Sequence, residues 1–318
     1  MDNEQTEKLL VVVVNWNGGE NTLECIDSLR RQTFRTFDLV VVDNGSSESE
    51  LRILDGRFGG TIRIMRLGEN LGFPEACNRG FALAAEARYT YLMTVNNDTR
   101  LDREVMGALL AVADRDELIG AVVPKIYYWH RPNTIQYAGG DCSLALGMTI
   151  HRGINTEDTG NFDEECDIGF AEASACLYRV SAIERVGFFD AAFFAYWEDA
   201  DLSMRLLQAH YRLVYCPTAK VWHKVSSSAP PHTKTFLFIR NAITFARRYC
   251  GNLQLISSLI SIMAVQGPIL VVQSVSRSSS WHEKREVLVA PFLALLWHVN
   301  RALVEERFWR PESSRSIE

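Results

Sequence analysis

The chain has 318 residues and a formal net charge of −6, with 47% hydrophobic and 23% charged residues. This composition is typical of a globular protein and excludes a disordered chain, and the acidic balance gives no general attraction to nucleic acid. Seven cysteines without a C-x-x-C pair argue against a disulfide framework and a zinc site. The length allows one large α/β domain with an appendage, or two smaller domains.

The first residues, MDNEQTEKLL, are polar and acidic and do not resemble a signal peptide. We therefore expect a reducing, cytoplasmic location. Charge is unevenly distributed along the chain, because ten Lys and Arg outnumber six Asp and Glu from Arg240 onwards.

Short apolar runs alternate with segments of helical periodicity over the first 124 residues. Strands are predicted at residues 9–14, 39–42, 62–65, 91–95 and 121–124, and helices at 20–32, 48–57, 74–87 and 103–113. This alternation indicates βαβ units and a mostly parallel, Rossmann-like α/β sheet flanked by helices. Hairpins and loops are predicted for residues 125–170, and further strands at 172–180, 212–216 and 221–223.

Polar residues follow three of the predicted strands. These stretches are NWNGG from Asn15, DNGSS from Asp43 and NNDT from Asn96. Each alone fits a turn or a helix cap, but three of them at the carboxyl edge of one sheet favour a ligand site. An acid such as Asp43 suits a ribose or a base edge, and Asp98 suits Mg²⁺ or Mn²⁺ together with a diphosphate. The sequence contains neither G-x-G-x-x-G nor G-x-x-x-x-G-K-[ST], which argues against a dehydrogenase and a P-loop enzyme.

The stretch AYWEDADLSMR places three carboxylates beside two aromatic rings. Asp201 is accounted for by an i,i+4 pair with Arg205. A helix N-terminus rich in acids is the alternative for the whole cluster of Glu198, Asp199 and Asp201. It accounts for Asp201 but not for rings and acids that converge. We therefore interpret this stretch as catalytic.

The sequence changes character after Thr235. An aromatic, basic helix is predicted at residues 236–249. Residues 251–276 lack charged side chains but are interrupted by Ser, Gln, Gly and Pro, a poor match to a spanning helix, and 287–299 is too short to span. Apolar helices with basic flanks predict docking on an anionic membrane surface, while a helical layer on the catalytic domain or a dimer interface are the alternatives.

Six motifs in order, VVVVNWNGG, VVDNGSS, ENLGFPEACNRG, TVNNDT, VGFFDAAFFAYWEDADLSMR and CPTAKVWH, resemble those of family 2 glycosyltransferases with the GT-A fold. The similarity is to rhamnosyltransferase-like and galactofuranosyltransferase-like members and covers about residues 9–249. It implies a catalytic domain over residues 1–235, with a nucleotide-sugar half at about 1–124 and an acceptor half at about 125–235. Residues 236–318 would form a helical region that meets the membrane or another copy of the chain.

The resemblance also implies roles for single residues. The expected nucleotide-binding residues are Asn15, Asn17, Asp43, Asn70, Gly72, Phe73, Asn78, Arg79 and Asn97. Asp98 and His223 are the expected ligands of Mg²⁺ or Mn²⁺. Asn96 stands where many members have the first acid of a D-x-D motif, which leaves the strictness of the metal requirement open.

For the transfer step, the resemblance implies Asp199 as the base that accepts the proton of the acceptor hydroxyl. Glu198 and Trp197 are the expected acceptor-binding residues. The run from Glu172 to Ala175 replaces a small-residue stretch that often contains glycine under the donor sugar, so the identity of that sugar is not carried over.

We expect an inverting, metal-dependent enzyme that transfers a sugar from a UDP- or dTDP-sugar, with dTDP-rhamnose as the first guess. The acceptor would be a hydroxyl of a glycan or lipid-linked sugar in cell-envelope polysaccharide synthesis, reached from the inner membrane face by a peripheral protein. A homo-oligomer through the C-terminal region is left open. The alternatives are a nucleotidyltransferase, which would favour a basic phosphate loop where NWNGG has no Lys or Arg, and a non-catalytic nucleotide- or sugar-binding scaffold at the membrane.

Overall fold

The structure is a computed structural model that describes residues 9–225, 229–301 and 304. The chain divides into two compact units. Unit 1 comprises Met1–Asp141, Ile150–Ala191 and Glu198–Ser226, and unit 2 comprises Cys142–Thr149, Ala192–Trp197 and Ser227–Glu318.

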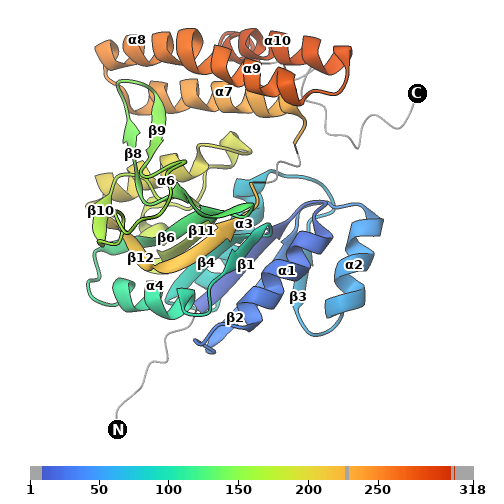
Figure 1. The fold of residues 1–318 in the computed structure, drawn as a ribbon, viewed down its shortest axis with the longest axis vertical. Coiled ribbons are helices and arrows are strands. Elements are labelled where there is room, and N and C mark those ends of the chain that lie inside the picture. The colour runs from blue at the N-terminus through green and yellow to red at the C-terminus, as the bar shows by residue number, and fades with distance from the viewer. Residues whose placement is uncertain (1–8, 226–228, 302–303, 305–318) are drawn as a thin grey trace. The chain divides into compact units, whose positions relative to one another are not determined.

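The first part of unit 1 alternates strands and helices as the sequence predicts (Figure 1). Its elements are β1 (Leu9–Asn15), α1 (Gly19–Arg30), β2 (Phe37–Asp43), α2 (Glu48–Phe58), β3 (Arg63–Arg66), α3 (Phe73–Glu86), β4 (Tyr91–Asn96), β5 (Thr99–Leu101), α4 (Val105–Ala113) and β6 (Ile119–Tyr128). Later elements are β7 (Arg131–Tyr137), β8 (Gly140–Ser143), β9 (Met148–His151), β10 (Cys166–Ile168), β11 (Ala175–Arg179), α5 (Val180–Val186), η1 (Ala191–Phe193), α6 (Glu198–Gln208) and β12 (Arg212–His223).

The main sheet of unit 1 is mixed, with the order β10-β12-β6-β11-β4-β1-β2-β3. The pairs β1–β2, β1–β4 and β2–β3 are parallel, whereas β11 runs antiparallel between β4 and β6. The two short strands expected at residues 212–216 and 221–223 are one long strand, β12, with an irregularity between Cys216 and Lys220. The half of the sheet that contains β1 to β4 is therefore parallel, and it carries the polar strand ends at Asn15 and Asp43.

Strand β1 is buried on both faces, which explains its nearly continuous run of valine and leucine. Val11 and Val13 belong to the hydrophobic core that also contains residues of α1, α2 and α4. Val12 points the other way, towards Gly80 of α3, where a Cβ atom would lie only 2.5 Å from a Val12 methyl group. The helices α1 and α3 thus cover opposite faces of the sheet, and its carboxyl edge stays available for polar side chains.

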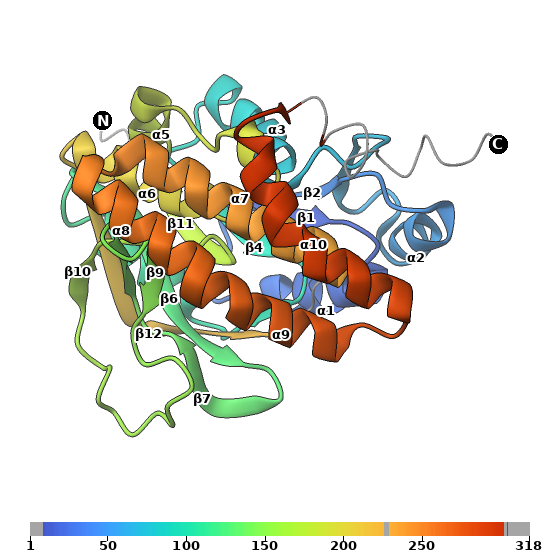
Figure 2. The ribbon, with the colours of Figure 1, turned by 90° about the horizontal axis from the view of Figure 1, so that it is seen from above.

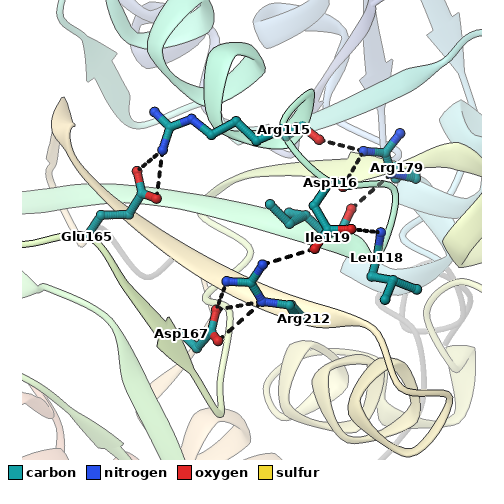
Figure 3. Close-up of polar contacts among 9 residues, drawn as sticks. Arg115, Asp116, Leu118, Ile119, Glu165, Asp167, Arg179 and Arg212 are labelled. Carbon is teal, nitrogen blue, oxygen red and sulfur yellow. Dashed lines mark hydrogen bonds and ion pairs between the residues drawn. The ribbon is translucent and has the colours of Figure 1, made fainter.

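Ion pairs tie the segment before β10 and β10 itself to the rest of unit 1 (Figure 3). Arg212 at the start of β12 contacts Asp167 at 2.8 Å and Asp116 at 3.0 Å. Arg115 contacts Glu165 at 2.9 Å. These side chains are largely exposed, so the pairs fix the position of the segment more than they stabilise the fold.

Unit 2 is helical and contains α7 (Pro231–Tyr249), α8 (Asn252–Ser261), the π-helical turn η2 (Ile262–Gln266), α9 (Gly267–Arg277) and α10 (Trp281–Trp297). Figure 2 shows α8 and α9 running end to end, and α7 packs against α8, α9 and α10. Helix α10 begins with a capping box in which the Ser280 side chain accepts from the backbone N–H of Glu283.

The elements α8, η2 and α9 form one continuous helix of 26 residues, Asn252–Arg277, which is long and apolar enough to cross a membrane by length and composition. The expectation that this stretch is a poor match to a spanning helix is therefore wrong by those two criteria. The serine, glycine and proline residues do not break the helix. Pro268 stands in the first turn of α9, directly after the π-helical turn η2.

Candidate active site

Asn15 is the central polar residue at the carboxyl edge of the sheet. It is fully buried at the end of β1, and the strand register places it beside Asp43 at the end of β2. Its side-chain nitrogen donates to Oδ1 of Asp43 at 2.8 Å and to Oγ of Ser46 at 3.0 Å. Its side-chain oxygen accepts from Thr22 at 2.8 Å and from Asn97 at 3.1 Å. Three expected nucleotide residues, Asn15, Asp43 and Asn97, thus share one hydrogen-bonded cluster.

Asn17 joins the turn after β1 to the turn after β2. Its backbone is left-handed, with φ of 50°, a conformation that asparagine tolerates better than most residues. Its backbone N–H donates to Oγ of Ser46 at 2.8 Å, and its side-chain oxygen accepts from the backbone N–H of Ser47 at 2.9 Å. The two turns therefore hold each other in place beside Asp43.

Asn70 and Gly72 shape the entry to α3. Oδ1 of Asn70 accepts from Nδ2 of Asn44 at 2.9 Å and from the backbone N–H of Gly72 at 2.9 Å. Gly72 has φ of 88°, which favours glycine, and it directly precedes Phe73 at the start of the helix. The ring of Phe73 lies 5.9 Å from that of Phe189, measured between centroids.

The side chains of Asn78 and Arg79 on α3 both contact other residues of the chain. The Asn78 amide donates to the carbonyl of Phe189 at 2.8 Å and accepts from its N–H at 3.1 Å. Arg79 pairs with Glu75 one helical turn earlier, at 2.8 Å. Asn78 therefore holds a backbone segment next to Phe73, and the Arg79 side chain, about half exposed, lies along its own helix.

Asp98 follows β4 and His223 ends β12, and their side chains meet. Oδ1 of Asp98 lies 3.1 Å from Nε2 of His223, and both residues are nearly buried. The other ring nitrogen of His223 lies 3.1 Å from Oε1 of Gln136 on β7. Burial alone would lower the pKa of the His223 imidazole, but the hydrogen bond and charge of Asp98, with the charge of Glu172, raise that pKa above its ordinary value.

The Asp98–His223 pair has the donor chemistry of a divalent-cation site. Carboxylate oxygens suit Mg²⁺ and Mn²⁺, imidazole is a common ligand of transition-metal ions, and two neighbouring ligands of an octahedral ion of this size lie about 3.0 Å apart. Gln136 is the kind of outer partner that orients a metal-binding imidazole. No group of three or more His, Cys, Asp and Glu side chains among the described residues could hold a metal. The pair would therefore need further oxygen ligands from a substrate.

Asp199 lies in the first turn of α6, where free backbone N–H groups favour a carboxylate. Its Oδ1 accepts from the N–H of Ala200 at 2.9 Å and its Oδ2 from the N–H of Ala173 at 3.3 Å. Burial raises the pKa of Asp199 to about 7, the charge of Glu172 adds to the rise, and the backbone hydrogen bonds oppose it. A carboxyl with this pKa is partly ionised near neutral pH, as a general base requires.

Glu198 is the more buried of the two neighbouring acids. Within the part of the chain that the structure describes, its Oε2 atom has no hydrogen-bond partner. Burial, followed by the negative charge of Asp199, raises the pKa of Glu198 well above its ordinary value. This shift favours the protonated form of the Glu198 carboxyl, so Asp199 is the better candidate for a base in this pair.

Trp197 belongs to unit 2, and its side chain is buried there. Its ring centroid lies 5.0 Å from that of Phe245 and 5.7 Å from that of Phe238, both on α7. Only 4% of the residue is exposed. This differs from the expectation that Trp197 offers an open face to a sugar ring, because the two phenylalanine rings on α7 pack against it.

A chain of side chains leads from Asp98 to the neighbourhood of Asp199. His223 contacts Asp98 with one ring nitrogen and Gln136 with the other, and Nε2 of Gln136 donates to Oε1 of Glu172 at 3.3 Å. The charge of Glu172 in turn raises the pKa of Asp199. The expected metal ligands and the expected base therefore belong to one connected polar region of unit 1.

Gln136 and Glu172 are the residues of this region that the sequence does not identify as site residues. Gln136 lies in β7, inside a stretch whose irregular pattern predicts only hairpins and loops. For Glu172 a signal exists, since a charged residue stands directly before the small residues that lead into β11. A nearly buried acid at such a position points to a polar partner inside the protein.

A mixed α/β sheet with polar strand ends at its carboxyl edge has the general layout of an α/β enzyme that binds its ligand at that edge. Residues 10–187, more than half of the chain, match the model of Glycosyl transferase family 2. The chain belongs to this family, which confirms the family and the fold class expected from the sequence motifs.

Curated proteins are similar over much of the chain. An N-acetylglucosaminyl-diphospho-decaprenol L-rhamnosyltransferase of Mycobacterium tuberculosis is 28% identical over 306 residues, which cover 86% of this chain and 96% of that protein. A poly-beta-1,6-N-acetyl-D-glucosamine synthase of Staphylococcus aureus is 23% identical over 226 residues, 69% of this chain and 50% of the synthase.

Two solved structures share the fold. GalNAc-T7 with UDP, GalNAc and Mn²⁺ matches with a TM-score of 0.62 at 14% identity, covering 96% of this chain and 59% of the GalNAc-T7 chain. Residues 1–349 of S. aureus TarS match with a TM-score of 0.54 at 15% identity, covering 94% of this chain and 82% of that one. At these identities the likeness concerns the fold.

Proposed function

We propose that this chain is an inverting glycosyltransferase that moves a sugar from a UDP- or dTDP-sugar to a hydroxyl of a lipid-linked acceptor in cell-envelope polysaccharide synthesis. The name of the M. tuberculosis relative supports a rhamnose donor, such as dTDP-rhamnose, and a polyprenyl-diphosphate-linked sugar as acceptor. The observation that carries the proposal is the connected polar region in which Asp199, with its raised pKa, and the Asp98–His223 pair lie in one unit.

The nucleoside of the donor is proposed to bind at the cluster around Asn15. Asp43 is held by Asn15 and by the backbone N–H of Ser46, so its carboxylate has a fixed orientation. A fixed acceptor group of this kind suits hydrogen bonds from a pyrimidine edge or a ribose hydroxyl. Asn17, Asn70, Gly72, Phe73, Asn78, Arg79 and Asn97 are proposed to shape the same pocket, directly or through the backbone that they hold.

Mg²⁺ or Mn²⁺ is the proposed cofactor, with Asp98 and His223 as the protein ligands. The bound ion would neutralise the negative charge on the diphosphate leaving group. Gln136 fixes the His223 ring through its second nitrogen, so that Nε2 stays directed at Asp98.

Asp199 is the proposed general base. It accepts the proton of the acceptor hydroxyl while the hydroxyl oxygen forms a bond to the anomeric carbon of the donor. The bond from that carbon to the diphosphate oxygen breaks, and its electron pair leaves with the nucleoside diphosphate. Attack from the side opposite the leaving group inverts the configuration. Glu198, whose raised pKa favours the protonated form, is proposed to donate a hydrogen bond to the acceptor.

The test is titration calorimetry with UDP and dTDP, with and without Mn²⁺, on the wild-type chain, Asp98→Ala and Asp199→Asn. We expect metal-dependent binding to be lost in Asp98→Ala and kept in Asp199→Asn, while sugar transfer is lost in both. The nucleotide that binds more tightly identifies the donor class. If the folded wild-type chain binds neither nucleotide, the proposal fails and a non-catalytic scaffold becomes the better description.

We also propose that the protein works at the cytoplasmic face of the membrane as a peripheral protein. A polyprenyl-linked acceptor is confined to the bilayer, so an enzyme that uses it must reach the membrane surface. The two alternatives for residues 251–299 are a helical layer on the catalytic domain and a contact between copies of the chain. Neither of them predicts binding to lipid.

A further inference from the structure

The helix Asn252–Arg277 exposes six large aliphatic side chains, while its buried residues, with the exception of Ile262, are small or polar. Ser258, Gly267 and Ser274 are buried within unit 2. The large exposed residues are Leu253, Ile256, Ile260, Val265, Ile269 and Val272. A helix at the surface of a water-soluble protein has the opposite arrangement, with apolar residues inward and polar residues outward.

The contacts on the buried side resemble those between helices in apolar surroundings. The hydroxyl groups of Ser274 on α9 and Thr235 on α7 lie 2.8 Å apart. At Gly267, a Cβ atom would lie 3.6 Å from the end of Ile239 on α7, so the two helices approach closely there. Small residues and hydrogen-bonded hydroxyls at such contacts are typical of helices that are surrounded by lipid.

Helix α10 repeats this inverted pattern. Its buried residues are Val287, Ala290 and Ala294, whereas five of its large side chains are exposed. The exposed ones are Trp281, Leu288, Val289, Phe292 and Leu295. Trp281, which is 80% exposed at the start of the helix, is of the residue type that prefers the boundary between lipid and water. We call the exposed apolar residues of α8, α9 and α10 together the apolar face.

The charge of unit 2 is complementary to an anionic surface. Residues 229–301 contain eight Lys and Arg but only two acids, Glu283 and Glu286, in a chain whose net charge is −6. Arg277 and Arg285, at the end of α9 and in the first turns of α10, are exposed next to the apolar face in sequence. Basic residues beside exposed apolar ones bind the headgroups of anionic lipids.

We propose that the apolar face docks on an anionic phospholipid bilayer, with the helix Asn252–Arg277 lying in the plane of the membrane interface. The apolar face would be the surface through which the peripheral protein proposed above binds the membrane. That the membrane side is the cytoplasmic one rests on the proposed function. It does not depend on which sugar is transferred.

Contacts within unit 2 favour an in-plane helix over a spanning one. At 1.5 Å per residue the helix is about 39 Å long, so length alone permits a span of about 30 Å of hydrocarbon. However, Oγ of Ser257 donates to the carbonyl of Ala145 at 2.8 Å, and Nε2 of Gln266 donates to that of Leu146 at 2.7 Å. The irregular segment between β8 and β9 therefore lies along the middle of the helix, and such backbone is not tolerated against lipid hydrocarbon.

The first test is co-flotation of the purified full chain with vesicles of phosphatidylglycerol and with vesicles of phosphatidylcholine. The variant replaces Ile256, Ile260, Ile269 and Val272 with Gln. The matched control replaces two exposed apolar residues of unit 1, Leu118→Gln and Ile154→Gln. We expect binding of the wild type to phosphatidylglycerol, a loss of at least about tenfold in the partition coefficient of the fourfold variant, and little change in the control.

Two results would overturn the proposal. One is a fourfold variant that floats with vesicles as the wild type does. The other is a wild type that ignores both vesicle types but sediments as a dimer that the fourfold variant loses, because a second copy would then cover the apolar face. If the double variant Arg277→Gln with Arg285→Gln binds phosphatidylglycerol vesicles as the wild type does, the electrostatic part of the proposal is wrong.

A labelling experiment separates an in-plane helix from a spanning one. Asn252→Cys and Ser276→Cys place a thiol at either end of the helix, in a chain whose partly exposed Cys142, Cys166 and Cys250 are changed to Ser. An in-plane helix leaves both ends open to an impermeant maleimide from the outside of sealed vesicles. A spanning helix protects one end, and that result would overturn the in-plane arrangement.

Failure of this inference and failure of the proposed function are distinguishable. The fourfold variant is expected to keep sugar transfer to a short, water-soluble acceptor analogue while it loses binding to vesicles. A chain that binds vesicles but transfers no sugar to any acceptor would contradict the enzyme proposal alone.

Discussion

Oδ1 of Asp98 lies 3.1 Å from Nε2 of His223, although Asp98 stands in the turn between β4 and β5 and His223 ends β12, at a distant place in the sequence. The raised pKa of His223 favours a shared proton between the two side chains. A divalent cation bound by the same two atoms would displace that proton, since metal ligands must be deprotonated. The orientation of the imidazole is then decided by its other neighbour, Gln136.

We predict that Gln136→Leu weakens metal-dependent nucleotide binding by about 10- to 100-fold, because the His223 ring loses the partner that orients it. Gln32→Leu is the matched control, since Gln32 is also a buried glutamine of unit 1 and bonds to the carbonyl of Asp102 at 2.6 Å. Both changes should lower the free energy of unfolding by about 1–2 kcal/mol. Calorimetry with Mn²⁺ and the nucleotide distinguishes them, and equal affinities in the two variants would contradict the role of Gln136.

The pH dependence of transfer tests the base. Asp199 must be ionised to accept a proton, and its pKa of about 7 predicts that kcat/KM falls about tenfold per pH unit below that value. Glu172→Gln removes a negative charge that raises this pKa. We therefore expect the acidic limb of the pH profile to move to lower pH in Glu172→Gln. An unshifted limb would mean that another group is the base.

The same shift predicts how stability depends on pH. The ordinary pKa of the Asp199 carboxyl is 3.8, so between about pH 4 and 7 the folded chain holds a proton that the unfolded chain has released. The contribution of Asp199 to stability therefore falls as the pH rises through this window. Asp199→Asn removes the contribution, and its free energy of unfolding should gain on that of the wild type from about pH 4 to 7, which urea titrations at several pH values measure.

The sequence predicts the parallel part of the site because its physical signals are local. Leu9–Asn15 is a continuous apolar run with a polar end, and the same holds for the strand that ends at Asp43. In a parallel sheet such ends meet at one edge, so the neighbourhood of Asn15 and Asp43 follows from the pattern alone. Asp98 and His223 follow from motifs of the family, and their contact depends on the pairing of β5 with β12.

The remaining features depend on contacts between distant segments. Gln136 reaches His223 from a strand whose pairing with β6 contains two register shifts, and no local signal reports such shifts. Trp197 lies next to two acids in the sequence, yet its ring packs on Phe238 and Phe245 of α7. The helix Asn252–Arg277 continues through serine and glycine because those residues make its inward contacts, which periodicity within one segment does not reveal.

The segment that directly precedes Glu198 and Asp199 has an unusual backbone. Phe194, Tyr196 and Trp197 have φ of 63°, 68° and 74°, in the left-handed region that costs a residue other than glycine about 1–2 kcal/mol. Such a conformation persists only where neighbouring groups fix it. Asn241 on α7 is that neighbour, because its side-chain nitrogen donates to the carbonyls of Phe193, Ala195 and Tyr196 at 2.8, 2.7 and 2.8 Å.

We predict that Asn241→Leu, which keeps the approximate size of the side chain, lowers the free energy of unfolding by about 2–4 kcal/mol, because three carbonyls each lose one hydrogen bond, although that of Phe193 keeps the one from Arg240 at 2.7 Å. It should also lower kcat more than KM for the donor, since the backbone that leads into Asp199 relaxes. Thr244→Val is the matched control, because the Thr244 hydroxyl bonds to the Arg240 carbonyl within α7 itself. Urea unfolding and steady-state kinetics measure both effects. A variant that is destabilised but keeps the wild-type kcat would show that Asn241 stabilises the segment without positioning the base.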